Sequence, residues 1–235
     1  MAGDPVDADG SRGGAMCWSA RADLVAGAAV AAVGVACVVR ARRRTDLPMA
    51  ALPLLLGAHQ IVESAVWAAD GGSGPATLAW AAIAMPLLAV WVPVGVWCAA
   101  PRRARTRVGV LVAVGAVTAA ALAHALAVHP VTAEIRGHTL GYVVDLPYAQ
   151  LVIAGYLVAT IGSLLLSGER GLVVLGILVT AGALVCWTLW ELEFVSTWCA
   201  VAAVSSVVLF FWVNGRDREP EKRPYVSARR GGSTG

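Results

Sequence analysis

The feature that most constrains this chain is a series of apolar stretches that follow one another along its whole length. Each has about 18 or more residues, enough for a helix rising about 1.5 Å per residue to cross a bilayer core of roughly 30 Å. Helices are expected because they pair their own backbone groups, and the alternating pattern of a membrane β-barrel is absent. We predict seven spans, at residues 22–39, 47–69, 76–100, 108–128, 148–167, 172–190 and 194–213.

The composition agrees with a membrane location. Hydrophobic residues make up 58% of the 235-residue chain, charged residues only 14%, and the mean hydropathy is +0.72. A soluble domain has about 25% charged residues. We therefore predict an all-α polytopic membrane protein in contact with lipid. The net charge of +3 is explained by topology, so no nucleic-acid partner is expected.

The basic residues predict the orientation of the spans. On one side of the predicted bundle lie 15 of the 18 lysines and arginines, and only Arg12, Arg21 and Arg136 are on the other. Cytoplasmic loops of membrane proteins carry the excess of positive charge. We therefore expect the amino terminus outside the cell and the carboxyl terminus in the cytoplasm.

Three regions are predicted along the chain. Residues 1–15 form an acidic amino-terminal extension, expected to be disordered or to precede the true start of the protein. Residues 16–213 form the seven-helix membrane domain, and residues 214–235 a basic, disordered cytoplasmic tail. An acidic segment before the first span and arginines after it are the reverse of a cleavable secretory signal.

The second span carries ionisable residues in the stretch GAHQIVESAVW, where His59 and Glu63 are four residues apart. Residues at this spacing share one helix face and can bond to each other. Counted from Leu47, His59 lies about 18 Å and Glu63 about 24 Å along the span, in its outer half. Other spans bring polar or aromatic residues to a similar depth. The predicted pocket residues are His59, Gln60, Glu63, Trp67, His124, Trp187, Glu191 and Trp198.

Three interpretations of this cluster stay open. It could be a polar clasp that holds helices together, because a charged group in lipid needs a partner. It could be a hydrolytic site in which His59, Glu63 and His124 hold zinc with one open position for water. It could also bind or transport a small molecule, since intramembrane ionisable groups often line proton or substrate routes.

An outer loop and two cysteines lie on the same side as the cluster. Residues 129–147 form the one long outer loop, expected to be an ordered cover and alternatively a functional lid. Cys17 and Cys199 both lie near the outer face, where an oxidising compartment would allow a disulfide between them.

Three stretches of the chain resemble an uncharacterised bacterial family of multi-pass membrane proteins. They read MCWSARADLVAGA from Met16, LPLLLGAHQIVESAVW in the second span, and WELEFVSTWCAVAAVSS before and within the seventh. Members of that family begin Met-Cys-Phe-Ser-Ala, and this chain departs in having Trp18 in place of phenylalanine. The resemblance implies that Met16 is the true start and that the protein lies in the bacterial cytoplasmic membrane, but it implies no activity.

The sequence therefore favours an integral membrane protein of unassigned activity whose outer-leaflet polar pocket binds a small or lipidic molecule without a cofactor. A metal-assisted hydrolase of lipid, with zinc as its cofactor, is the alternative. A proton-coupled carrier of small molecules is the second alternative.

Overall fold

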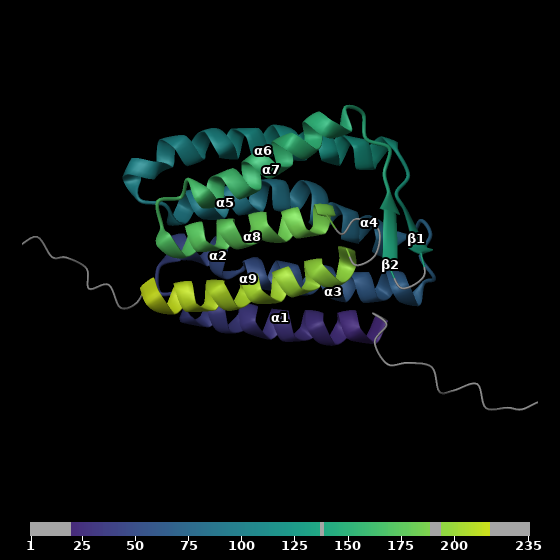
Figure 1. Ribbon diagram of the computed structural model, residues 1–235, viewed down its shortest axis with the longest axis horizontal. Helices are drawn as coiled ribbons and strands as arrows, with labels where there is room; N and C mark the ends of the chain where they lie inside the picture. Colours follow the sequence, from purple (N-terminus) through teal and green to yellow (C-terminus); the bar gives the residue numbers. More distant parts are fainter. Residues whose placement is uncertain (1–19, 137–138, 189–193, 217–235) are drawn as a thin grey trace, which may run out of the picture.

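The computed structural model describes residues 20–136, 139–188 and 194–216. Its long helices run side by side as a bundle, and a two-stranded sheet lies across one end (Figure 1). The α-helices are α1 (Ala20–Arg40), α2 (Leu47–Ala50), α3 (Leu52–Ala68), α4 (Pro75–Ala82), α5 (Leu88–Ala99), α6 (Arg102–Val128), α7 (Ala149–Leu165), α8 (Arg170–Thr188) and α9 (Phe194–Arg216). Two short turns, η1 (Arg44–Asp46) and η2 (Ile83–Leu87), extend or interrupt them.

The predicted apolar runs are helical over most of their described residues, with breaks at Ala51 and at some of their ends. The turn η1 leads directly into α2, and only Ala51 separates α2 from α3, so the three form one helical segment; η2 joins α4 and α5 into another. Within the described residues, four segments are long and apolar enough to cross a membrane: 20–40, 44–68, 75–99 and 102–128. The remaining three runs form shorter apolar helices over the part that is described.

Two helices extend beyond the predicted spans at their basic ends. The helix α6 begins at Arg102, six residues before the predicted span, and α9 continues to Arg216, three residues beyond it. Arginine has a high helix propensity, so a helix continues through charged residues where the apolar run has stopped. Asn214 and Arg216, predicted to belong to the tail, are therefore helical.

A proline shapes the segment that contains α4 and α5. Pro86 lies inside η2, a π-helical turn in which backbone bonds are rearranged because proline has no N–H to donate. The hydroxyl of Tyr156 on α7 donates a 2.9 Å hydrogen bond to the carbonyl oxygen of Ala84 in this turn. The irregular turn thereby fixes α7 against the segment.

The long outer loop folds as a β-hairpin, which the sequence did not predict. Strand β1 (Thr132–Arg136) pairs antiparallel with β2 (Thr139–Val143). Ala133 also forms an isolated bridge with Gly72, in the turn between α3 and α4. The hairpin is thus fastened to the bundle at the end that we call the hairpin end (Figure 1).

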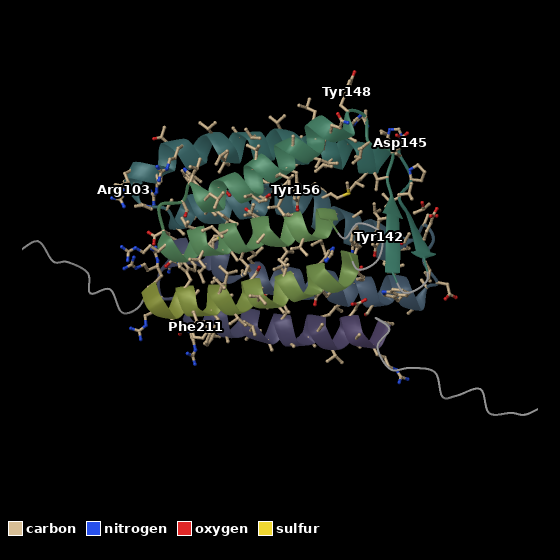
Figure 2. The ribbon with its side chains drawn as sticks, in the orientation of Figure 1. Arg103, Tyr142, Asp145, Tyr148, Tyr156 and Phe211 are labelled. Atoms are coloured by element: carbon tan, nitrogen blue, oxygen red, sulfur yellow. The ribbon has the colours of Figure 1, made fainter. Side chains whose placement is uncertain are left out.

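The opposite end, which we call the basic end, carries the arginines that begin or finish α1, α6 and α9 (Figure 2). Arg216 makes the main ionic interactions at this end. The Arg216 guanidinium donates to both carboxylate oxygens of Asp46, at 2.9 and 3.0 Å, and lies 2.8 Å from the Glu169 carboxylate. This ion network connects the end of α9 to the turn before α2 and to the connection between α7 and α8.

Candidate functional site

The polar residues of α3 lie in the interior of the bundle, near the hairpin end. His59 is 7% exposed, Gln60 3% and Glu63 5%. His59 and Glu63 do not form the expected hydrogen bond with each other. Instead the imidazole packs against Trp80 of α4, with ring centroids 4.9 Å apart and an interplanar angle of 40°. The two ionisable groups therefore share a helix turn without neutralising each other.

A second carboxylate, absent from the predicted site, joins them from α1. Asp23 is fully buried in the first turns of that helix. Its carboxylate interacts electrostatically with that of Glu63 and is approached by the indole N–H of Trp67. Two buried acidic side chains from different helices thus lie in the same region of the bundle.

Aromatic side chains surround the two carboxylates. The rings of Trp80 and Tyr142 stack face to face, with centroids 3.4 Å apart and planes within 5°. Both side chains lie near the carboxylate of Glu63, but neither Trp80 Nε1 nor Tyr142 Oη has a hydrogen-bond partner of acceptable geometry. Tyr142 belongs to strand β2, so the hairpin contributes directly to the cluster. Burial, followed by the nearby charge of Glu63, raises the pKa of the Tyr142 phenol.

Many polar atoms of this cluster are buried and have no hydrogen-bond partner of acceptable geometry. Proteins normally pair such atoms, and each exception calls for an explanation. At this end of the described bundle they are Asp23 Oδ1 and Oδ2, His59 Nε2, Gln60 Oε1, Trp67 Nε1, Trp80 Nε1 and Tyr142 Oη. We refer to these residues with Glu63 as the acid cluster.

An apolar cavity of about 280 Å³ lies next to the acid cluster, and we call it the hairpin-side cavity. His59 and Trp80 belong to both, so they form the polar end of the cavity. Side chains of α5, α6 and α7, with Ala84 and Met85 of η2, Leu56 of α3 and Leu146 before α7, form the rest of its wall.

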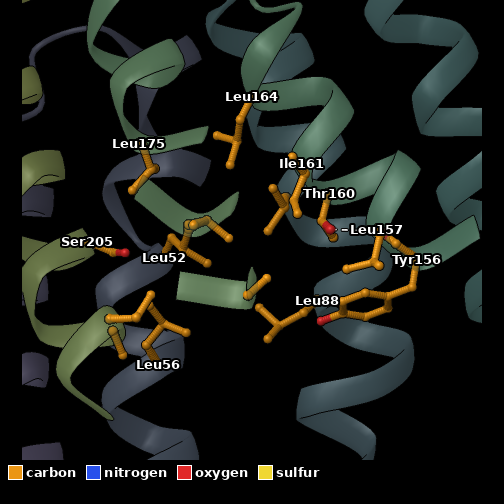
Figure 3. A pocket seen from close by; sticks show the side chains of 15 residues that line it. Leu52, Leu56, Leu88, Tyr156, Leu157, Thr160, Ile161, Leu164, Leu175 and Ser205 are labelled. Atoms are coloured by element: carbon orange, nitrogen blue, oxygen red, sulfur yellow. Dashed lines mark hydrogen bonds between the residues drawn. The ribbon is translucent and has the colours of Figure 1, made fainter. Parts of the chain in front are cut away.

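A second apolar cavity, the core cavity of about 100 Å³, lies among α3, α5, α7, α8 and α9. The side chains of Leu52, Leu164 and Leu175 face it (Figure 3). Tyr156 and Leu88 line this cavity as well as the hairpin-side cavity. The two cavities are therefore neighbours that share these side chains as part of their walls.

The structure separates His124 from the other predicted residues. His59, Gln60, Glu63 and Trp67 lie together on α3, but His124 is exposed on α6 and does not line the hairpin-side cavity. The prediction considered the depth of His124 along the helix but not which face of the helix it occupies. Glu191, Trp198, Cys17, Cys199 and the side chain of Trp187 lie outside the described residues.

The described residues contain no group of three or more His, Cys, Asp or Glu side chains that could hold a metal ion. His59 and Glu63, two of the three proposed zinc ligands, are close in sequence and space, but the third, His124, is exposed elsewhere.

Fold and site together define a helical protein with four helices suited to crossing a membrane and a buried acidic and aromatic cluster at one end. The profile of a family of unknown function, DUF6629, matches residues 16–224, and the chain belongs to this family. No curated protein and no solved structure matches the chain.

Proposed function

We propose that this protein is a seven-span protein of the bacterial cytoplasmic membrane that binds a small amphiphilic or lipidic molecule in the hairpin-side cavity. Its hairpin end faces outward and its basic end faces the cytoplasm. The role is one of binding, with no chemical step assigned to the acid cluster.

One observation carries the proposal: the hairpin-side cavity is apolar along its length and polar at its His59 and Trp80 end. Its volume of about 280 Å³ is close to the lower end of the range for small-molecule sites, roughly 300–1,000 Å³. A ligand with one polar head and one apolar chain matches both parts.

The distribution of arginines supports the orientation. Arg40, Arg102 and Arg216 all lie at the basic end, which by the positive-inside rule is cytoplasmic. With that end in the cytoplasm, the acid cluster lies toward the outer leaflet, where an amphiphile could enter from the lipid.

The proposal is tested by photolabelling the protein in lipid vesicles with an uncharged alkyl alcohol that carries a diazirine. We expect saturable labelling of Met85, a cavity residue, which an excess of unlabelled alcohol removes. Val117 of α6, 72% exposed, serves as the reference for simple partitioning into lipid and should be labelled without saturation.

A matched pair of variants distinguishes binding in the cavity from contact with lipid at the outer surface. Ala84→Phe places a ring in the hairpin-side cavity, and Ala121→Phe places the same ring on the exposed face of α6. The first should abolish saturable labelling of Met85 and the second should leave it unchanged. Labelling confined to outward-facing residues such as Val117, with no saturation, would refute the binding role.

A further inference from the structure

We propose that the core cavity is a second binding site, which takes a small apolar molecule of the ketone class and holds its oxygen with the hydroxyl of Ser205 on α9. This site is separate from the hairpin-side cavity and does not depend on the function proposed for it. The size of the cavity, the chemistry of its wall and one unpaired hydroxyl point to this class of ligand.

The core cavity is larger than the voids usual in a protein interior. Its volume is about 100 Å³, whereas about 10–15 Å³ is enough to hold one water molecule and interiors have few voids larger than that. An apolar cavity of about 150 Å³ engineered into another protein binds benzene or xenon. The core cavity therefore suits a molecule of about four to six non-hydrogen atoms.

The wall of the cavity is apolar except at the side chains of Tyr156, Thr160 and Ser205. Two of these hydroxyls are already used. Tyr156 donates to the carbonyl oxygen of Ala84 at 2.9 Å, and Thr160 donates to that of Tyr156 at 2.7 Å. The Ser205 hydroxyl has no hydrogen-bond partner within the described part of the chain. The cavity therefore offers one free polar group in an otherwise apolar space.

The Ser205 hydroxyl is free although its own helix offers it a partner. A serine or threonine inside a helix can donate to the carbonyl oxygen of the residue four positions earlier. Thr180 and Ser206 do so, to Gly176 and Ala202, each at 2.7 Å. Ser205 is 4% exposed, and its hydroxyl points toward the cavity instead (Figure 3). Because a buried hydroxyl without a partner is unfavourable, a ligand oxygen beside it would stabilise the site.

A ketone fits the cavity better than water does. A buried water molecule typically makes about three hydrogen bonds. With one free hydroxyl on the wall, a water molecule here would be left with bonds unmade. A ketone oxygen only accepts, and the serine hydroxyl has one hydrogen to donate. The remainder of a ketone is apolar and matches the leucine side chains that face it.

The cavity wall includes a side chain at the outer surface of the helices. Leu157 of α7 lines the cavity and is also 42% exposed. In a membrane this surface contacts lipid, where small apolar molecules concentrate because their transfer out of water is favourable. Leu157 thus belongs both to the wall of the site and to the surface that such a molecule reaches first.

The test compares butanone with its methylene analogue, a hydrocarbon of the same shape in which a methylene group replaces the oxygen. The full-length protein, in nanodiscs and with isotope-labelled leucine methyl groups, is titrated with each compound. The readout is the shift of the methyl resonances of Leu175, a cavity residue that is 1% exposed. We expect it to saturate with both compounds. Leu151, 74% exposed, reports partitioning into lipid and should shift without saturation.

A matched pair of serine variants tests the contact with the oxygen. Ser205→Ala should weaken butanone binding about fivefold, as for one neutral hydrogen bond, and leave binding of the hydrocarbon unchanged. Ser206→Ala is the control, because its hydroxyl already bonds to Ala202 and does not line the cavity. It should change neither affinity. Comparing one compound across variants cancels its partitioning into lipid.

A second pair of variants tests the location. Ala183→Leu fills part of the core cavity, and Ala181→Leu adds the same side chain at an exposed position of the same helix, α8. The first should abolish the saturable shift at Leu175 for both compounds. The second should leave it unchanged.

Three results would overturn the proposal. Equal butanone affinity of wild type and Ser205→Ala would show that the cavity does not select an oxygen-bearing ligand. Absence of a saturable shift at Leu175 with either compound would show that there is no site. A saturable shift that survives Ala183→Leu would place the ligand elsewhere. Photolabelling of Met85 reports on the hairpin-side cavity alone, so the proposed function is tested separately.

Discussion

Gly27 of α1 packs so closely against α3 that a Cβ atom on it would lie 2.8 Å from the carbonyl oxygen of Gly57. A Cβ on Gly57 would in turn lie 2.6 Å from the carbonyl oxygen of Gly27. Small residues that let two backbones approach are a common device for packing helices in membranes. Asp23 lies one helical turn from Gly27, so this contact holds the carboxylate of α1 beside that of α3.

The glycine contact predicts a loss of stability when either residue gains a methyl group. Gly57→Ala should lower the free energy of unfolding by about 1–3 kcal/mol, because the neighbouring atom is backbone and cannot move aside without shifting α1. Gly215→Ala is the control, since no atom lies within 4 Å of its Cβ position. Denaturant unfolding followed by circular dichroism measures both, and equal stability of Gly57→Ala and wild-type protein would contradict the close packing.

The ion network at the basic end predicts a large effect of removing Arg216. The side chains of Arg216 and Asp46 are 12% and 4% exposed, so Arg216→Gln leaves the buried carboxylate of Asp46 without its cation. Breaking a buried pair in this way costs about 3–5 kcal/mol.

Arg40→Gln is the matched control for Arg216→Gln. It removes an exposed hydrogen bond to Asn214 and a contact of the guanidinium with the Phe210 ring at 5.1 Å, so the free energy of unfolding should change by about 1 kcal/mol or less. Similar losses in the two variants, in the same unfolding experiment, would show that the network does not hold α9 in place.

Tyr142 predicts a pH effect at the hairpin end. Its pKa is raised by burial and by Glu63, so the folded protein keeps the phenol proton at a pH where the unfolded chain, with a pKa near 10, releases it. Stability should therefore fall as the pH rises above about 10. Tyr142→Phe should weaken this decline, which is measured as the midpoint of unfolding at pH 8 and at pH 11. An identical decline in variant and wild type would contradict the buried environment of Tyr142.

The proposed orientation predicts which end of the bundle is accessible from outside intact cells. Asp145→Cys lies by the hairpin and Arg103→Cys at the basic end, and both positions are exposed. In a background without the native cysteines, a membrane-impermeant maleimide should label Asp145→Cys in intact cells, and Arg103→Cys only after permeabilisation. The reverse pattern would invert the topology.

The sequence predicted the helices well because apolar length is a direct consequence of crossing lipid. It also placed His59, Gln60 and Glu63 in one cluster, since they occupy neighbouring positions on one helix. It did not predict the β-hairpin of residues 132–143, whose short strands are held by contacts with the turn at Gly72. Such tertiary contacts leave little trace in local sequence.

His124 and Asp23 show that depth along a span does not by itself identify the buried residues. His124 was predicted from its height along the fourth span, yet the buried face of α6 runs through Thr118, Leu122 and Ala125. Asp23 was overlooked because it lies at the margin of the first apolar run. Asp23 lies four residues before Gly27, so the two share one helix face. Gly27 and Gly34 lie on the buried face of α1, and this spacing was the available sign that Asp23 is buried as well.

The most direct test of the account is an experimental structure of the protein with a bromine-labelled alkyl alcohol, in which the anomalous signal locates the chain. The account predicts a bromine peak inside the hairpin-side cavity, between His59 and Tyr156, that is lost in Ala84→Phe. Bromine peaks found only on the outward faces of the helices, with wild type and Ala84→Phe alike, would contradict it.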